Sequence, residues 1–510
     1  MRSPAPRLLV VAHRLPSSWI PAWTFARHAG LAFLIFVLFP SLAAASGDGE
    51  GAAGGHHAEV PMGVTLLFVG LLVAMILCLA FEEKLHAKKS VIVGIFAVVC
   101  LFVGDAFHLL PLGPVVNAFG ETLNVPVYIP AIDWGVIAII LGSSLFVDIT
   151  SRSGLFTWIA IKLTKASGGD PRKLLWAYGI MTVVFSAVLN NVTAMIIVGS
   201  LTAVSLDKLK RRSLLLGFLM VEALLTNIGG LLTLISSVPN IIVGQTAGIS
   251  FVRFFVVAAP FVTVATVVTL LLGARFFKIE SLKSEDEIEE AARLVSGFDE
   301  NDGIESRGFF IFGTVMTMAF ICAMAMTSVT PVLRDLGMGY VALSFAAIML
   351  VRFKAVADTF YQALDWDLLA FFAGLFVVIN VMEHARVLAL IGQGVEGIIG
   401  LGDVAGTGAV LLSSAFFSSV TDNIPLAAML AKILAGLGTA PDSPLWWAVI
   451  FGANLGGNLT PIGSASTLVA VTIMHKQKLQ MSFGGFIVKA LPYAVVQITL
   501  AVAYVLIFLR

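Results

Sequence analysis

The chain has 510 residues, of which 58% are hydrophobic and only 12% are charged, and its mean hydropathy is +0.98. Soluble domains carry about 25% charged residues, so an ordinary globular protein is excluded. The apolar runs are long and continuous, which argues against the ten-residue alternation of a membrane β-barrel. At roughly 20 residues per helix plus connections, we predict an all-α polytopic membrane protein with about 11 spans.

The charge and the cysteines exclude several other classes. Lysine and arginine together number 31, as do aspartate and glutamate, so no nucleic-acid partner is expected. Cys78, Cys100 and Cys322 each lie alone in an apolar run, which predicts neither a disulfide framework nor a metal site. We expect the lipid bilayer as surroundings and no cofactor.

The amino-terminal region resembles an export signal. Arginines precede the short apolar core 31–42, and Ala43-Ala44-Ala45 follows it. We expect a signal peptide at 1–45 and an external tail at 46–61, with an uncleaved extra helix as the alternative.

The connections between apolar runs indicate the orientation in the membrane. Lysine and arginine concentrate near 84–89, 172–173, 208–212, 275–278, 352–354 and 476–478. By the positive-inside rule these connections are cytoplasmic. We therefore predict a multi-pass protein of the bacterial inner membrane with the mature amino terminus outside.

The chain contains two related halves. Asp133-Trp134 and Asp365-Trp366 open matching apolar runs at an offset of 232 (366 − 134), and SAVLNNVTAM (186–195) matches SSVTDNIPLA (418–427) at the same offset. TNIGGLLTLISS (226–237) matches ANLGGNLTPIGS (453–464) at an offset of 227 (454 − 227). We predict membrane repeats at 62–279 and 309–510, joined by a cytoplasmic linker at 280–308.

The flanks of the matching segments differ in charge. Segment 174–206 lies between lysine- and arginine-rich connections, whereas the flanks of 406–437 contain neither residue. The two copies should therefore enter the membrane from opposite sides. Inverted repeats are typical of secondary transporters, whose substrate site lies between the repeats near the bilayer midplane.

Both segments predict re-entrant hairpins. Each is longer than one span, and polar residues interrupt it at mid-length: Asn190-Asn191, with Thr193 beyond, and Asp422-Asn423. Irregular backbone at membrane depth is tolerated only where it lines protein or a water-filled cavity. Two continuous helices with buried polar residues are the alternative.

Two further segments predict discontinuous helices. Paired glycines cost about 2 kcal/mol of helix propensity relative to alanine, and unwound carbonyls suit Na⁺. The candidate ligands around these breaks are polar or glycine residues at largely matching positions: Asn227, Gly229, Gly230, Thr233, Ser236, Asn454, Gly456, Gly457, Thr460 and Ser464. A packing role for the glycines is the alternative.

Three acidic residues are candidates for proton coupling, because buried acids in membranes are costly and usually functional. Asp422 is favoured since it lies at a predicted hairpin tip, whereas Glu222 and Asp148 are weaker candidates. Neither lysine nor arginine falls near the four breaks in the sequence, which favours a cation as the transported species.

The motifs VEALLTNIGG, SSVTDNIPLAAM and FGANLGGNLTPIGSAS resemble the ion transporter superfamily. This superfamily includes arsenite permeases, NhaD-type antiporters, divalent anion/sodium symporters and the melanosomal P protein, and the P-protein-like, citrate-transporter-like branch is the most similar. The resemblance implies a homodimer, an elevator motion, and ion and substrate binding at the hairpin tips and broken helices. Asn190-Asn191 departs from the usual Asp-Asn tip.

The favoured activity is Na⁺/H⁺ antiport, in which Asp422 releases a proton when Na⁺ binds near Asn191 and Asn423. Na⁺-coupled transport of a carboxylate or an arsenite-like oxyanion is the first alternative, and a passive anion channel is the second. We find no nucleophile elbow, zinc-protease helix or phosphate loop, so an enzyme is not expected.

Overall fold

A computed structural model describes residues 60–80, 82–116, 119–354 and 357–509, so the predicted signal peptide and nearly all of the tail lie outside the described residues. The described chain is helical except for a two-stranded antiparallel ribbon, β1 (Val115–Val116) and β2 (Thr122–Leu123). Ten of its helices are long and apolar enough to cross a membrane, by length and composition. The all-α polytopic prediction is confirmed.

The helices up to the linker are α2 (Met62–Ala80), α3 (Glu82–Leu85), α4 (Lys89–Ala106), α5 (Tyr128–Ala131), α6 (Trp134–Ser151), α7 (Leu155–Ala166), α8 (Pro171–Val188), α9 (Asn191–Lys208), the 3₁₀ turn η2 (Arg212–Leu214), α10 (Leu215–Gly229), α11 (Val238–Thr246) and α12 (Phe251–Phe276). The remaining helices are α13 (Glu285–Ser296), α14 (Arg307–Met326), α15 (Pro331–Arg352), α16 (Ala357–Ala363), α17 (Trp366–His384), α18 (Val387–Ile399), α19 (Asp403–Val420), α20 (Asn423–Gly436), α21 (Pro444–Gly456), α22 (Ala465–Lys476) and α23 (Phe483–Phe508).

Element boundaries repeat at the offset found in the motifs. Helices α8 and α19 begin and end 232 positions apart (403 − 171 and 420 − 188). Helices α12 and α23 do the same, and each contains an internal proline, Pro260 or Pro492 (492 − 260 = 232). The duplication therefore extends to helices whose sequences share no obvious motif.

Both predicted hairpins are interrupted where polar residues stand. Asn190 has extended backbone and its side chain accepts a hydrogen bond from the Thr193 amide, so it caps α9. Asp422 caps α20 in the same way by accepting from the Ile424 amide. Such caps satisfy amides that the first helical turn leaves unpaired. The first arms of the two hairpins, α8 and α19, begin at Pro171 and Asp403, three residues before the predicted segments.

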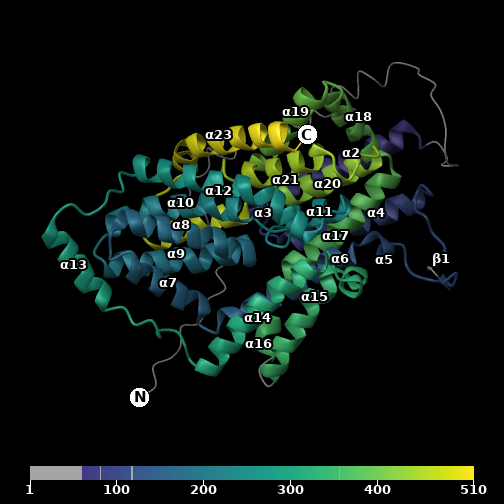
Figure 1. Cartoon of the computed structure of the whole chain (residues 1–510). Helices are drawn as coiled ribbons and strands as arrows, with labels where there is room; N and C mark the ends of the chain where they lie inside the picture. Colours follow the sequence, from purple (N-terminus) through teal and green to yellow (C-terminus); the bar gives the residue numbers. More distant parts are fainter. Residues whose placement is uncertain (1–59, 81, 117–118, 355–356, 510) are drawn as a thin grey trace.

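The second half of each broken helix packs against the other copy's hairpin. Helix α11 contacts α20, and α22 contacts α9. Helices α8, α9 and α10 also lie together, as Figure 1 shows. The hairpins and broken helices of both copies therefore form one interlocked body.

A second set of helices packs in pairs, α4 with α17 and α6 with α15. Gly142 lets α6 approach α15 closely, because a Cβ at this position would lie 2.5 Å from the backbone carbon of Ala342. Small residues permit such close helix contacts in membranes.

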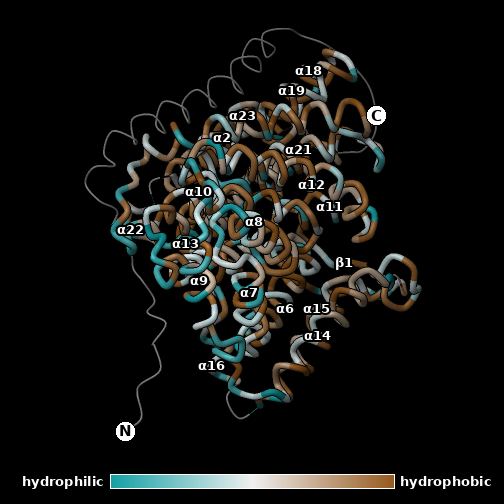
Figure 2. Tube along the Cα trace, turned by 60° about the vertical axis from the view of Figure 1, so that its left-hand side comes forward, coloured by the Kyte–Doolittle hydropathy of each residue, from teal (hydrophilic) through white to brown (hydrophobic). Residues whose placement is uncertain are grey.

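The linker helix α13 and the segment after it lie beside basic residues of α7 and of the segment that follows the first hairpin. Lys210 Nζ lies 3.0 Å from Glu290, Arg211 lies 3.5 Å from Glu287, and Lys165 lies 3.1 Å from Glu300. Figure 2 shows α13 and α16 as hydrophilic segments beside largely hydrophobic helices. These basic residues and the linker thus share one face of the molecule.

Candidate ion-binding site

The breaks of the two discontinuous helices meet at two buried asparagines. Asn227 Nδ2 donates to Ser464 Oγ at 3.0 Å, and Asn454 Oδ1 accepts from Ser237 Oγ at 2.7 Å. These are equivalent pairs, because Asn227 corresponds to Asn454 and Ser237 to Ser464 at the offset of 227. Each asparagine therefore bonds to the serine that ends the opposite loop, and the two copies close around a shared centre.

The hairpin arms support these loops through matching hydroxyl groups. Ser186 Oγ donates to the Thr226 carbonyl at 2.6 Å, and Ser418 Oγ donates to the equivalent Ala453 carbonyl at 2.5 Å. Thr233 and Thr460, two of the predicted ligands, donate to the carbonyls of Ala187 and Ser419 at 2.5 and 2.6 Å. These two hydroxyls therefore join each loop to the end of a hairpin arm.

The paired glycines end the broken helices, and they also allow neighbouring segments of the chain to pack closely against them. A Cβ at Gly229 would lie 2.7 Å from the Val183 backbone, and one at Gly456 would lie 2.2 Å from the Ala415 carbonyl oxygen. A Cβ at Gly230 would meet the Asn191 amide at 2.6 Å, and one at Gly457 would lie 2.9 Å from Ser464 Cβ. The packing and helix-breaking interpretations of these glycines therefore both apply.

The first loop satisfies its own carbonyl groups. Ser236 Oγ donates to Gly230 O at 2.6 Å, and Asn240 Nδ2 lies 2.6 Å from the same oxygen and 3.0 Å from Thr233 O. Ser236 is also 2.8 Å from Thr233 O. Protein donors thus occupy the space that these carbonyls enclose.

The second loop has fewer donors at the equivalent positions. Gly463 replaces Ser236, and Thr467 replaces Asn240. The single Thr467 hydroxyl lies 3.4, 3.2 and 2.8 Å from the carbonyl oxygens of Thr460, Pro461 and Ser464. Thr460 O and Ser464 O also accept from the amides of Gly463 and Leu468, at 3.3 and 3.2 Å, so Pro461 O is the carbonyl that depends on the shared hydroxyl. Carbonyl oxygens of this kind are ligands that hard cations prefer. The sequence prediction missed Thr467, although its equivalence to Asn240 was visible.

The two hairpin tips reach different surroundings. Asn191 Oδ1 lies 2.8 Å from Ser186 Oγ, whose one proton is shared with the Thr226 carbonyl, and Asn191 Nδ2 lies 3.4 Å from Asn227 Oδ1, so this tip touches one of the two central asparagines. Asn190 is exposed and serves as the helix cap. Asn423 is the first residue of α20.

Asp422 forms an ion pair that the sequence prediction missed. Its Oδ2 lies 2.5 Å from Lys89 Nζ at the start of α4, and among the described residues its polar partners are this lysine and the Ile424 amide. The sequence argument considered basic residues near the breaks along the chain and therefore did not include this lysine. Lys89 is 333 positions away in the chain, so only the packing of α4 beside the second hairpin brings the charges together.

The other two acids lie apart from this pair. Glu222 is fully buried in α10, where its Oε1 accepts from Thr202 Oγ1 at 2.6 Å and its Oε2 has no hydrogen-bond partner among the described residues. Asp148 lies near the carboxyl end of α6, and its Oδ2 is 3.6 Å from Arg152.

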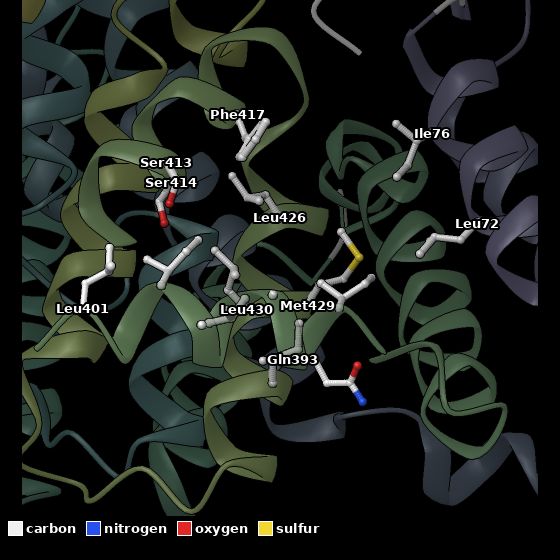
Figure 3. Close-up of a pocket in the computed structure, with 16 residues that line it drawn as sticks. Leu72, Ile76, Gln393, Leu401, Ser413, Ser414, Phe417, Leu426, Met429 and Leu430 are labelled. Carbon is white, nitrogen blue, oxygen red and sulfur yellow. The ribbon is translucent and has the colours of Figure 1, made fainter. Parts of the chain in front are cut away.

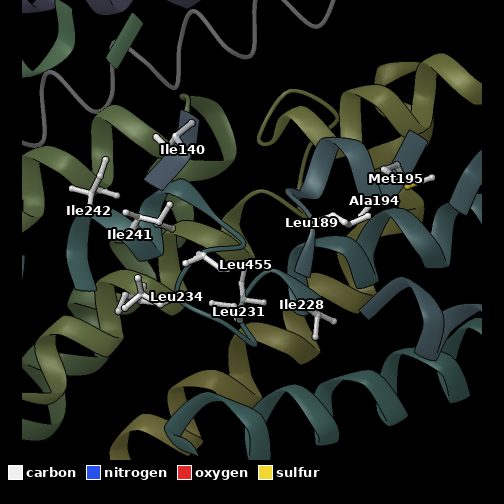
Figure 4. Close-up of a cluster of buried hydrophobic side chains, with 14 of the residues drawn as sticks. Ile140, Leu189, Ala194, Met195, Ile228, Leu231, Leu234, Ile241, Ile242 and Leu455 are labelled. Atoms are coloured by element: carbon white, nitrogen blue, oxygen red, sulfur yellow. The ribbon is translucent and has the colours of Figure 1, made fainter. Parts of the chain in front are cut away.

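Apolar side chains surround the first tip and loop. Figure 4 shows Leu189 and Met195 of the hairpin near Ile228, Leu231 and Leu455 of the two broken helices.

A separate apolar cavity of about 300 Å³ lies between α2, α18, α19 and α20. Its lining includes Leu72, Phe417 and Met429, as Figure 3 shows, and contains no charged residue. This cavity does not provide the features of an ion site.

Two interrupted hairpins and two interrupted helices, one of each in either copy of the repeat, make up the kind of fold that membrane transporters with inverted repeats adopt. Comparison with solved structures agrees. The YdaH transporter of Alcanivorax borkumensis matches with a TM-score of 0.55 at 13% identity, covering 87% of this chain and 98% of that one. The MtrF antimetabolite efflux pump of Neisseria gonorrhoeae matches with a TM-score of 0.54 at 14% identity, covering 95% and 97%.

Sequence comparison identifies the family. The citrate transporter family (CitMHS) matches residues 112–452, so the chain belongs to this family and is a membrane transporter. An uncharacterized transporter of Mycobacterium tuberculosis, Rv2684, is 31% identical over 73% of this chain and 86% of its own length. The human P protein is 24% identical over 84% of this chain and 60% of its own length.

Proposed function

We propose that the protein is a cation-coupled secondary transporter of the bacterial inner membrane that exchanges Na⁺ for H⁺. The observation that carries this proposal is the oxygen-rich second loop, where three carbonyls share the Thr467 hydroxyl. Na⁺ would bind there, with Ser464 contributing its hydroxyl. The Asp422 carboxylate would supply the negative charge at the tip of the adjoining hairpin.

An elevator motion fits the two sets of helices. The interlocked hairpins and broken helices would move together, while the α4–α17 and α6–α15 pairs would remain in place. The Lys89–Asp422 ion pair joins the two sets, so it would have to break when the site crosses the membrane. The predicted homodimer would supply a fixed frame for such a motion.

Na⁺-coupled transport of a carboxylate such as citrate is the second candidate. Two observations favour it: the family's description as a citrate transporter, and a lysine at the second hairpin tip that could attract an anion. In the described structure, however, Asp422 already neutralises this lysine.

Proton flux in proteoliposomes tests the main proposal. A Na⁺ gradient should drive proton movement reported by an internal pH dye, and Asp422→Asn should abolish it because the amide keeps the helix cap but cannot hold a charge. Labelled citrate supplied with Na⁺ tests the alternative. Na⁺-dependent citrate uptake without Na⁺-driven proton movement would replace the first proposal by the second.

A further inference from the structure

We propose that Asn458 and Gln497 are positioning residues of the cation site: through the side-chain amide of Asn227 they hold the Ser464 hydroxyl where it can bind Na⁺. This inference deepens the proposed Na⁺/H⁺ exchange and rests on it. Both residues lie outside the set of ligands predicted from the sequence, and neither would contact the ion itself.

A chain of buried amides leads from α12 to the central asparagines. Helix α23, which packs against both α12 and α21 (Figure 1), contributes Gln497. Gln497 Nε2 donates to Thr269 Oγ1 of α12 at 2.9 Å, and its Oε1 accepts from Asn458 Nδ2 at 2.8 Å. Asn458 Oδ1 in turn accepts from Asn227 Nδ2 at 2.8 Å. All four side chains are at most 1% exposed, so water does not compete for these bonds.

The Leu224 carbonyl sets the direction of this chain. Its oxygen can only accept, and it lies 3.2 Å from Asn458 Nδ2, so the amide nitrogen of Asn458 faces Leu224 and the amide oxygen faces Asn227. Asn227 therefore turns its own nitrogen toward Asn458. The second hydrogen of this nitrogen is donated to Ser464 Oγ at 3.0 Å. The orientation of Asn227 is thus decided by Asn458.

This orientation joins Asn227 to both sides of the candidate site. Its nitrogen holds Ser464, the residue that ends the second loop. Its oxygen accepts from Ser466 Oγ at 3.0 Å and lies 3.4 Å from Asn191 Nδ2 at the first hairpin tip. If the Asn227 amide turned over, its nitrogen would face the Asn191 nitrogen, and the contact between tip and loop would be lost.

The first copy of the repeat has no equivalent chain. The residue equivalent to Asn458 is Leu231, at the offset of 227, and the residue equivalent to Gln497 is Ala265, at the offset of 232. The additional amides therefore belong to the same copy as Thr467, whose loop is the candidate cation site. Buried amides cost free energy unless they are fully hydrogen-bonded, and a positioning role at this site accounts for their presence.

Calorimetric titration of the purified full chain with NaCl measures the effect. Residues that orient metal ligands without touching the metal typically change metal affinity by about 10- to 100-fold when they are replaced. Asn458→Leu, which introduces the residue of the first copy, should therefore raise the Kd for Na⁺ roughly tenfold or more. Gln497→Met keeps the side-chain length but removes the amide, and it should raise the Kd to a smaller extent.

Combining the two substitutions tests whether Gln497 acts through Asn458. If it does, adding Gln497→Met to Asn458→Leu should leave the Kd for Na⁺ unchanged, because the link to Asn227 is already absent. A purely structural role would instead lower the melting temperature of each variant and leave the Kd of the folded protein as it was.

Tyr178→Phe is the control for losing buried hydrogen bonds away from the site. Tyr178 is 1% exposed, and its hydroxyl lies 2.7 Å from the hydroxyl oxygens of Thr164 and Ser205. This variant should melt at a lower temperature than the unmodified protein and should bind Na⁺ with the same Kd.

The outcomes separate the positioning role from the exchange itself. If Asn458→Leu and Gln497→Met bind Na⁺ as tightly as the unmodified protein, these residues do not position the site, although the Na⁺ site stands. Additive losses in the double variant would show that Gln497 does not act through Asn458. If the unmodified protein binds no Na⁺, the exchange is refuted, and this inference with it. Should Asn458→Leu fail to fold, Gln497→Met alone decides between these outcomes.

Discussion

Single residues in the two loops decide where a cation can be held. The loops share their asparagine, paired glycines and threonine, yet position 240 is asparagine and position 467 is threonine. The asparagine amide places two N–H donors among the carbonyls of the first loop, whereas the threonine places a single hydroxyl among those of the second. Small differences between equivalent residues therefore divide the duplicated site into a structural half and a candidate binding half.

Gly456→Ala should strongly destabilise the protein. The new Cβ would lie 2.2 Å from the Ala415 carbonyl oxygen, and this backbone atom belongs to a packed helix that cannot shift easily. Overpacking of this kind costs about 1–3 kcal/mol or more. The melting temperature in detergent measures the effect, and Gly436→Ala is the control because a Cβ there meets nothing within 4 Å. Equal melting temperatures for the two variants would contradict the close approach of α21 to α19 at Gly456.

At the scale of elements, each hairpin is divided by a polar residue that begins the second arm. The side chains of Asn190 and Asp422 accept hydrogen bonds from the backbone amides of Thr193 and Ile424, which would otherwise lack partners at membrane depth. Replacing such a cap by alanine typically costs about 1 kcal/mol. The same residues therefore end one helix, start the next and present polar groups at the tip.

The linker is held to the first hairpin region by exposed charges, which predicts a dependence on pH. Hydrogen bonds from Lys162 and Lys165 lower the pKa of Glu300. The stabilisation that the charged Glu300 side chain gives to the linker is therefore present above the ordinary glutamate pKa and is lost as the pH falls through the lowered value. Glu300→Gln should therefore increase amide hydrogen exchange near residue 300 at neutral pH. At pH values well below the ordinary glutamate pKa the unmodified protein should approach the same behaviour.

Hydrogen exchange followed by mass spectrometry, corrected for the intrinsic effect of pH on amide exchange, measures this change. Glu289→Gln, on an exposed position of α13, is the matched control and should leave exchange near residue 300 unaltered. If Glu300→Gln exchanges like the unmodified protein, these ion pairs do not hold the linker.

For the whole molecule, the repeats interlock. Each copy supplies a broken helix that packs on the other copy's hairpin, through α11 with α20 and α22 with α9. Neither half could bury these surfaces alone, so the two copies should fold as one unit. The inverted arrangement also requires the open ends of the hairpins to lie on opposite membrane faces.

Single cysteines test that orientation. After replacement of Cys78, Cys100 and Cys322, Ser213→Cys should react with a membrane-impermeant maleimide only from the cytoplasmic side. Asp442→Cys should react only from the external side. Both positions are exposed, and each follows one hairpin directly. A permeant maleimide should label both and is the control. Labelling of both sites from one side would refute the inverted topology.

The sequence alone determined the helical membrane class, the duplication, the hairpin interruptions and most of the polar residues at the centre. These features depend on local composition and spacing: apolar length predicts helices, and polar or glycine residues predict breaks. Equivalent motifs such as TNIGG and ANLGG also indicated which loops belong together.

The tertiary structure decided which side chains face one another. It brought Lys89 to Asp422 across 333 positions, joined Asn227 to Ser464, and turned Thr233 and Thr460 toward the hairpin carbonyls. Such contacts depend on how helices cross and which faces they present, and spacing along one chain does not encode the partner. The charge balance of the site is therefore a property of the packed molecule.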